Sequence, residues 1–426
     1  MPRNLTDLME AAVSAAPPET HHAADITHLA ERRQRRRTTF AAGAAALAVV
    51  AVAGGAFGLT RGGDDSTVEP TAPYQYGQEL DVKDAVAATS VRGFRVLPWT
   101  QPSVQHLGGG STLLPTYAGV DASGRLIVET YRDGGIVELD TVRLYDAPGQ
   151  PAAALEPPPS EGTSGERWIP SFTGDGRLLW TSTRLQGAPE GVNTIHVTDL
   201  AGGRDVSIPV GSVNDGVRAW VTGDRAWYEG QQSVTSQGTE IRQLFTVPVS
   251  GDRTAHLVAR DVLAADVSDG VAAWVTTDGR VHVANADGSG AREVPVPLDR
   301  GCVLTPAPQM SMDQAVAVAR DLVALTERCG RGADEFDELL AFDTSGHLLV
   351  HVKGFSVRAL SLSGASLAVG GVDGPSSLEN LVYNLRTGTL VSLGRFPGNL
   401  YPGTPQVAGP YVLWYDQSGH VGEFTE

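Results

Sequence analysis

The feature that most constrains the fold is a pattern that recurs six times along the chain. Each copy consists of a strand, a glycine-containing turn and a second strand, and a more apolar strand precedes it. Fifty glycines, 26 prolines and short apolar runs also suit many short strands better than long helices. The turn glycines lie 37 to 58 residues apart, near the length of a four-stranded blade: Gly149, Gly202, Gly251, Gly288, Gly346 and Gly388. The sequence therefore predicts an all-β fold of repeated sheets.

The apolar strands number seven, which predicts a seven-bladed β-propeller over residues 91–426. They read RLIVETY, RLLWTST, RAWYEGQ, VAAWVTT, LVALTER, SLAVGGV and YVLWYDQ. The last blade has only three strands before the chain ends, so we expect VRGFRVLPWTQ (91–101) to supply its outer strand and cover the open sheet edge. A large side chain recurs at one position of these strands, where it would fill the space between blades: Trp180, Trp227, Trp274 and Trp414.

Three phrases of this region, FTGDGRLLWTS, VTDLAGGRDVSIPV and ANADGSGAREVPV, resemble the WD-like repeats of periplasmic TolB-type propellers. The resemblance covers residues 91–426. TolB-type repeats usually read S-P-D-G-R at the first turn, of which Asp175, Gly176 and Arg177 keep the core. Such propellers mostly bind proteins, peptides or glycans, so the resemblance implies a binding or sensing module, although a fold alone assigns no activity.

An uncharged stretch of 20 residues, 40–59, precedes the repeats. As a helix it would span about 30 Å, the thickness of a bilayer core. Five arginines lie just before it and acidic residues follow it, so the positive-inside rule places the N-terminus in the cytoplasm and the propeller outside the cell. The sequence thus predicts a single-pass protein of the cell membrane. The alternative is a cleaved export signal, because the span is rich in Ala and Gly and RRTTF partly matches a twin-arginine signal.

The segments that flank this span are short. Residues 1–39 predict a helical cytoplasmic leader, and the polar, proline-containing residues 60–90 predict a linker. Such leaders resemble those of actinobacterial membrane-anchored anti-sigma-factor-like proteins, which implies a transmembrane regulator as an alternative function. The match lacks the family's zinc ligands, one His and two Cys, because the leader has His21, His22 and His28 but no Cys. Thirty arginines against two lysines also indicate a high-GC bacterium.

Charge excludes one class of partner. Residues 41–426 contain 26 basic and 44 acidic side chains, and such a surface repels phosphate backbones, so we expect no nucleic acid partner. Long acidic loops join the second and third strands of the predicted blades, and they could form a rim that binds a basic partner or Ca²⁺, or be a solvated surface. The candidate rim residues are Asp133, Glu138, Asp140, Glu190, Asp334, Glu335, Asp337 and Asp373, with Glu229, Glu338 and Glu379 in the same segments.

The two cysteines fall on one face of the predicted propeller. Cys302 lies in the link between the fourth and fifth blades, and Cys329 lies between the second and third strands of the fifth. Oxidation is possible outside the cell, so we expect a disulfide between them, with two free buried thiols as the alternative. Closing a loop of about 27 residues contributes roughly 3.5 kcal/mol in the chain-entropy model.

Motifs for enzyme chemistry were not found. The chain has no G-x-S-x-G, no H-E-x-x-H, no zinc-spaced Cys/His cluster and no phosphate loop, so we expect no cofactor and no catalytic site. A hydrolase or lyase remains as an alternative, because such an enzyme needs only two carboxylates at the correct separation. The main prediction is a membrane-anchored module that binds a protein, peptide or envelope glycan outside the cell.

The arginine asymmetry around residues 40–59 generates a prediction about topology. Protease added to intact cells should remove the propeller and leave the N-terminal leader intact, as measured by immunoblotting with antibodies against each part. Mature protein that starts after residue 50 and occurs in the membrane-free fraction would show instead that the segment is a cleaved signal.

Overall fold

The computed structural model describes most of residues 74–425, within a compact unit formed by Pro70–Glu426. The described ranges are 74–99, 105–106, 112–133, 137–156, 158, 166–173, 176–184, 193–200, 205–211, 218–234, 240–251, 253–299, 301–304, 316–330, 336–353, 356–372, 377–397, 405–415 and 419–425. None of the helical structure in these ranges is long and apolar enough to cross a membrane. The predicted leader (1–39) and membrane span (40–59) lie outside the described residues.

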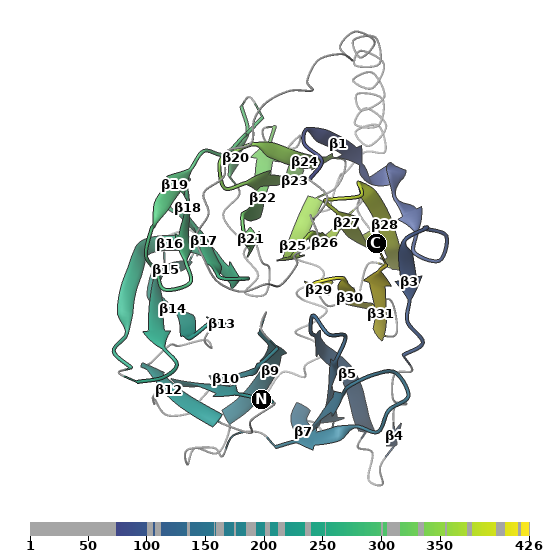
Figure 1. The fold of residues 1–426 in the computed structure, drawn as a ribbon, viewed down its shortest axis with the longest axis vertical. Coiled ribbons are helices and arrows are strands. Elements are labelled where there is room, and N and C mark those ends of the chain that lie inside the picture. The colour runs from purple at the N-terminus through teal and green to yellow at the C-terminus, as the bar shows by residue number, and fades with distance from the viewer. Residues whose placement is uncertain are drawn as a thin grey trace, which may run out of the picture. The chain divides into compact units, whose positions relative to one another are not determined.

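Strands account for nearly all regular structure in these ranges, so the all-β prediction is confirmed. The strands form six sheets, which Figure 1 shows arranged around a common centre as in a propeller. One 3₁₀ turn, η1 (Val82–Asp84), is capped by Asp81, whose side chain accepts a hydrogen bond from the backbone of Lys83. Pairing is antiparallel throughout the sheets except where β1 and β2 add to them.

Three sheets come from the first half of the unit. One contains β4 (Gln105–His106), β5 (Thr112–Val120), β6 (Leu126–Asp133), β7 (Val137–Tyr145) and β8 (Ala153–Leu155), and the next contains β9 (Glu166–Phe172), β10 (Leu178–Arg184), β11 (Asn193–Thr198) and β12 (Asp205–Gly211). The third has seven strands: β13 (Ala219–Thr222), β14 (Arg225–Val234), β15 (Glu240–Pro248), β16 (His256–Ser268), β17 (Val271–Thr276), β18 (Val281–Asn285) and β19 (Arg292–Val294).

The other three sheets each include a strand from the N-terminal end. They are β1 (Gln78–Asp81) with β20 (Val303–Leu304), β21 (Val316–Ala319), β22 (Leu322–Cys329), β23 (Phe336–Asp343) and β24 (Leu348–Lys353); β2 (Val86–Ala87) with β25 (Ser356–Ser363), β26 (Ser366–Val372), β27 (Ser377–Asn384) and β28 (Thr389–Pro397); and β3 (Phe94–Val96) with β29 (Gln406–Ala408), β30 (Tyr411–Tyr415) and β31 (Gly419–Phe424).

The seven-stranded sheet is continuous because β16 pairs with different strands along its two halves. Its first half pairs with β15 and its second half with β17. The register shifts between Val262 and Ala264, next to Asp261, which has a positive φ of 56°. A shift of this kind bends a strand, so β16 leaves one set of partners and enters the next.

The core lies between neighbouring sheets. One buried cluster joins Leu322 and Val350 of the sheet containing β22 to Leu360 and Leu381 of the sheet containing β27. The four tryptophans expected in blade cores are all buried: Trp180 in β10, Trp227 in β14, Trp274 in β17 and Trp414 in β30. The indole N–H of Trp227 donates to the carbonyl oxygen of Ala286 at 2.8 Å, so burial leaves no polar atom of that ring unsatisfied.

The N-terminal segment adds one edge strand to each of three consecutive sheets, and Figure 1 shows these strands in purple and blue. The predicted linker (60–90) is therefore wrong in its second half, because β1 pairs in parallel with β24 and β2 pairs in parallel with β28. These two strands were missed because each is short and the polar sequence around them lacks a period of two.

The strand expected from residues 91–101 is present as β3, which covers three residues and pairs with β31. The ring of Phe94 packs edge-on against Phe424 at 5.0 Å between centroids and contacts Trp414. Phe94 also shares a buried cluster with Val382 and Val391 of the preceding sheet. Phe94 therefore takes part in the packing of the last sheet against its neighbour.

Truncating Phe94 should test whether β3 stabilises the last sheet and its contact with the neighbouring sheet. Phe94→Ala removes a buried ring and should lower the free energy of unfolding by about 3 kcal/mol, whereas Val96→Ala on the same strand should change it by less than about 0.5 kcal/mol because Val96 is exposed. Urea unfolding followed by tryptophan fluorescence measures both. Equal effects of the two substitutions would mean that β3 does not hold the ring closed.

Candidate functional site

A cavity of about 390 Å³ lies where the innermost strands of the sheets meet. Its walls come from β5, β9, β13, β16, β25 and β29, from turns that follow them and from Leu179 of β10. These strands converge on the common centre, where β9, β13, β25 and β29 are edge strands of their sheets and β16 contributes its second half (Figure 1). The volume falls within the range of about 300–1,000 Å³ that small-molecule sites occupy.

The cavity wall mixes apolar and hydroxyl side chains. The half-buried Phe172 and Trp220 supply apolar surface, and Ser361 and Ser363 supply hydroxyls. The Ser361 hydroxyl accepts a hydrogen bond from the backbone N–H of Val407 at 3.1 Å, and the Ser363 hydroxyl accepts one from Gly409 at 2.9 Å. Each oxygen is thus fixed as an acceptor between two sheets, and its own hydrogen remains available for donation.

One carboxylate faces this cavity among the described lining residues, that of Asp266 near the end of β16. It is buried, and the backbone N–H of Val318 donates to its Oδ2 at 2.8 Å. Burial raises the pKa of Asp266 to about 6, and hydrogen bonds from the Val318 and Val267 backbone and from the Trp220 side chain limit the rise. Asp266 can therefore change its charge just below neutral pH.

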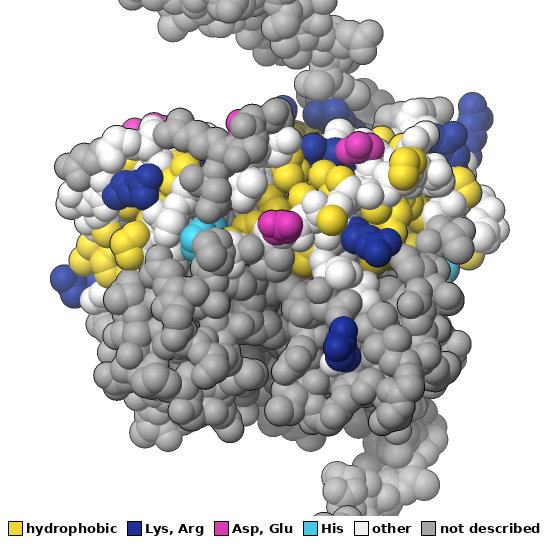
Figure 2. All heavy atoms as spheres, turned by 90° about the horizontal axis from the view of Figure 1, so that it is seen from below, with side chains coloured by type: hydrophobic (Ala, Val, Ile, Leu, Met, Phe, Trp, Pro, Cys, Tyr) yellow, Lys and Arg dark blue, Asp and Glu magenta, His cyan; other side chains and the backbone are white. Residues whose placement is uncertain are grey.

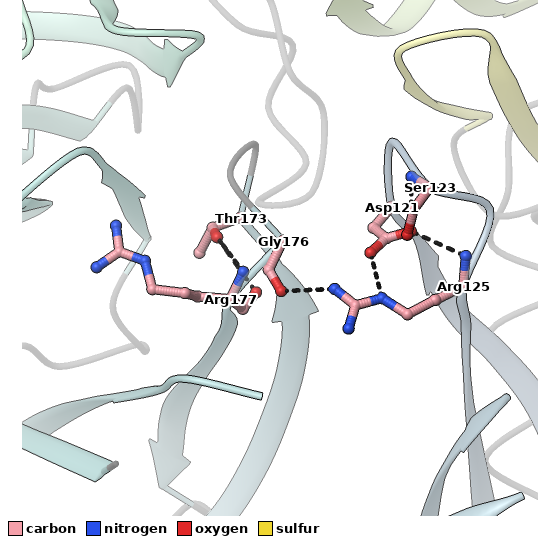
Figure 3. A network of polar contacts seen from close by, with 6 residues as sticks. All are labelled: Asp121, Ser123, Arg125, Thr173, Gly176 and Arg177. Atoms are coloured by element: carbon pink, nitrogen blue, oxygen red, sulfur yellow. Dashed lines mark hydrogen bonds and ion pairs between the residues drawn. The ribbon is translucent and has the colours of Figure 1, made fainter. Parts of the chain in front are cut away.

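Turns at one end of the cavity are locked to each other by polar contacts, which Figure 3 shows for the first two sheets. Asp121 forms an ion pair with Arg125 at 2.6 Å, and Arg125 Nη2 donates across to the carbonyl oxygen of Gly176 at 2.9 Å. Arg177 in turn donates to the carbonyl oxygen of Gly223 on the third sheet. The D-G-R core of the sequence thus has a structural use, since its arginine links neighbouring turns.

Further contacts continue this series around the cavity. The backbone N–H of Gly270 donates to Thr222 Oγ1 at 2.9 Å, and that of Gly364 donates to Asp269 Oδ2 at 3.2 Å. Because Thr173, Ser363 and Ala122 belong both to such turns and to the cavity wall, the contacts hold that wall in place. A wall fixed before binding lowers the entropy cost of taking up a ligand.

The predicted acidic rim stays a prediction, because its side chains lie outside the described residues. The structure describes the backbone of Asp133 in β6, of Glu138 and Asp140 in β7 and of Asp337 in β23, but it does not describe Glu190, Asp334, Glu335 or Asp373. On the face seen in Figure 2, the acidic and basic side chains that are described are interspersed among hydrophobic and uncharged atoms.

Three further acids assigned to the same loops lie inside strands instead, and that assignment was wrong for them. Glu229 in β14, Glu338 in β23 and Glu379 in β27 are buried. Glu229 pairs with Arg242, and Glu379 accepts a hydrogen bond from the Ser392 hydroxyl at 3.0 Å. The strands extend further than their apolar residues indicate, because these acids have partners on the neighbouring strand.

The two cysteines are joined in the structure, with Cα atoms 4.3 Å apart. Cys302 directly precedes β20, and Cys329 ends β22, with which β20 pairs. The disulfide therefore holds the segment that leads out of the seven-stranded sheet against the next sheet.

Asp266 is not among the candidate site residues predicted from the sequence, although the sequence contains a feature that indicates it. It is a single charged residue within the apolar run VLAADV, and a charge is retained in such a run when it has buried partners or a ligand. The apolar residues of this run predict a core strand, and this prediction is correct for Ala265 and Val267, which flank Asp266 and are buried.

Comparisons with known proteins assign no family to this chain. No protein-family model matches the chain, and no curated protein matches it. Among solved structures, it is similar to the β-propeller domain of the Trilobed protease from Pyrococcus furiosus (8% identity, 71% of this chain and 88% of that chain, TM-score 0.48). It is also similar to an oligogalacturonate lyase in complex with manganese (13%, 78% and 98%, 0.46) and to the RRP9 WD40 repeats (11%, 80% and 98%, 0.42).

The raised pKa of Asp266 generates a prediction about stability. Its folded pKa, about 6, lies above the ordinary value of 3.8, so its favourable contribution is complete below pH 3.8 and is lost as pH rises through 6. Between pH 5 and pH 7.5 the wild type should therefore lose about 1.4 kcal/mol of stability relative to Asp266→Asn, because about one pH unit of this range lies below the folded pKa. Urea unfolding at several pH values measures the difference.

The control for this prediction is Asp224→Asn, which changes an exposed carboxylate. It should follow the wild type across the same pH range. A constant difference between the wild type and Asp266→Asn from pH 5 to pH 7.5 would show that Asp266 does not titrate there.

Proposed function

We propose that the chain is an extracytoplasmic binding module that takes a peptide or glycan ligand into its central cavity. The observation that carries this proposal is the 390 Å³ cavity, whose walls come from the inner strands of six strand groups. Its fixed hydroxyls can donate to ligand oxygens, and Asp266 can accept from an amine or hydroxyl. Apolar surface from Phe172 and Trp220, which line the cavity and are half-buried, suits a sugar face or an aliphatic side chain.

The architecture that we propose for the folded part is a seven-bladed propeller. The division of β16 between two sets of partners supports this count. The first half of β16 completes a group of four strands with β13, β14 and β15, and its second half begins another group with β17, β18 and β19. With the five other sheets, that makes seven groups. The pairing of β3 with β31 supports a ring that the two ends of the unit close together.

Binding is a better proposal than catalysis. Most glycoside hydrolases use two carboxylates about 5–10 Å apart across the scissile bond. Among the described residues that line the cavity, Asp266 is the one carboxylate, and backbone and indole N–H groups already hold it. These contacts suit a fixed acceptor that orients a ligand.

The location that we propose follows from the sequence. Residues 40–59 would anchor the module in the membrane with residues 1–39 in the cytoplasm. Such a protein would present the cavity to envelope peptides or glycans and hold it near the membrane.

Filling the cavity should test the proposal. Gln406 lines it and is exposed, so Gln406→Trp should occupy ligand space without disturbing the core. Val86→Trp is the control, because Val86 is exposed on β2. We expect that N-acetylated oligosaccharides or tripeptides, titrated by calorimetry, will include a ligand that binds the wild type and Val86→Trp equally and that binds Gln406→Trp at least about tenfold more weakly, a loss of about 1.4 kcal/mol.

Two results would contradict the proposal. Equal affinity of Gln406→Trp and the wild type would place the binding site elsewhere. Cleavage of a bound oligosaccharide, detected as new reducing ends, would show an enzyme instead of a binding module.

A further inference from the structure

Four ionisable side chains converge at the outer part of the sheet that contains β22, β23 and β24, away from the central cavity. Glu327 in β22 lies opposite Glu338 in β23, and His351 comes from the adjacent β24. Asp299 approaches from the segment that follows β19. The register of three neighbouring strands therefore brings these groups together from distant parts of the sequence.

The cluster is centred on the imidazole ring of His351. His351 Nε2 lies 3.1 Å from Glu327 Oε1 and 3.0 Å from Glu338 Oε2, and His351 Nδ1 lies 3.8 Å from Asp299 Oδ2. The side chains of Glu327 and His351 are 0% and 2% exposed, whereas that of Asp299 is 55% exposed. A buried imidazole is thus surrounded by three carboxylates, one of which reaches solvent.

One oxygen in this cluster accepts no hydrogen bond. Nε2 carries at most one hydrogen, which Glu338 can accept, and the second oxygen of Glu327 accepts from the backbone N–H of Asp299 at 3.0 Å. Glu327 Oε1 is left without a hydrogen bond although the residue is completely buried. The close neighbour of this oxygen is His351 Nε2 at 3.1 Å, a nitrogen that it shares with Glu338, so a cation bound here would compensate a buried carboxylate that is otherwise costly.

We propose that Asp299, Glu327, Glu338 and His351 form a binding site for a divalent transition metal ion. One potential ligand atom from each residue lies within 4.8 Å of all the others. Ligands at about 2.1 Å from a shared ion lie roughly 3–4.2 Å from one another, so small side-chain movements would complete the site. An imidazole with three carboxylates suits Zn²⁺ or Mn²⁺, because Ca²⁺ and Mg²⁺ prefer sites built from oxygen ligands alone.

The residues around the cluster provide a point of entry for the ion, at Asp299, and a competing cation, the ammonium group of Lys353. Asp299 is the exposed member, so an ion can enter beside it. Lys353 Nζ lies 3.7 Å from Asp299 Oδ2 and 3.5 Å from Glu79 Oε1, and Glu79 on β1 is the register partner of His351. Metal bound by Asp299 would release Lys353 towards Glu79 and so strengthen the attachment of β1 to this sheet.

The disulfide controls the position of Asp299. Cys302 donates its backbone N–H to the carbonyl oxygen of Asp299 at 3.0 Å, and it is bonded to Cys329, two residues beyond Glu327 in β22. The bond therefore holds the turn that contains Asp299 next to the buried ligands. Reduction should free this turn and remove one ligand from the set.

The experiment measures metal uptake by the purified, oxidised full-length chain after chelator treatment and dialysis. Zn²⁺ is titrated by calorimetry, and Mn²⁺ is followed by electron paramagnetic resonance. We expect one ion per chain, at least about tenfold weaker binding in Glu327→Gln and Asp299→Asn, and a similar loss after reduction of the disulfide. Asp343→Asn is the matched control, because Asp343 forms a His–carboxylate pair with His347 at the surface, and it should bind like the wild type.

Asp299→Asn keeps the test decisive if Glu327→Gln fails to fold, because Asp299 is exposed. A direct readout is the NMR spectrum of the histidine rings, in which Mn²⁺ should broaden the signals of His351 and leave those of the distant, buried His196 unchanged. Absence of uptake, uptake unaffected by Asp299→Asn, or equal affinity for Ca²⁺ and Zn²⁺ would overturn the assignment.

Discussion

The pairing of β3 with β31 is the contact on which the arrangement of sheets depends, because it joins the two ends of the folded unit in one sheet. Every sheet around the centre buries its faces against two neighbours, so a missing contact at one place would expose apolar residues on both sides of the gap. Phe94 lies at this place and packs on Trp414 and Phe424. The strands β1 and β2 pair in parallel with β24 and β28, so the same N-terminal segment is also attached to the two preceding sheets.

A central cavity follows from that arrangement. The inner strands approach one axis from all sides, and the turns that follow them are held by the contacts of Arg125, Arg177 and Asp269. A cavity of about 390 Å³ remains where the ends of these strands meet. A rigid scaffold thus presents hydroxyls and one carboxylate in a fixed geometry, which is the property that a binding site needs.

The sequence predicted what depends on local pattern. Strand alternation, turn glycines and the recurring tryptophans led to sheets, hairpins and core positions that the structure contains, and the strand at residues 91–101 was expected from the missing partner of the last sheet. It did not predict β1 and β2, because two to four polar residues carry too little periodic signal.

The sites were less accessible to prediction than the fold. Asp266 and the His351 cluster each depend on cross-strand register, which brings together residues that are far apart in the sequence. Glu338 was assigned to the rim because its segment was expected to be a loop between the second and third strands of a blade, but register places it against His351 inside the sheet. Pattern shows which face of a strand a residue occupies, whereas its chemistry is decided by the partner across the strand.

Hydrogen exchange of the amides at the closing strand would test the account most directly. The N–H of Leu97 donates to the Val421 carbonyl oxygen at 2.8 Å, and that of Thr425 donates to the Gly93 carbonyl oxygen at 3.0 Å. If β3 closes the ring, both amides should exchange only through the cooperative unfolding that exposes the amides of β30. Exchange of Leu97 and Thr425 at the rates of an unstructured peptide, while β30 stays protected, would contradict closure.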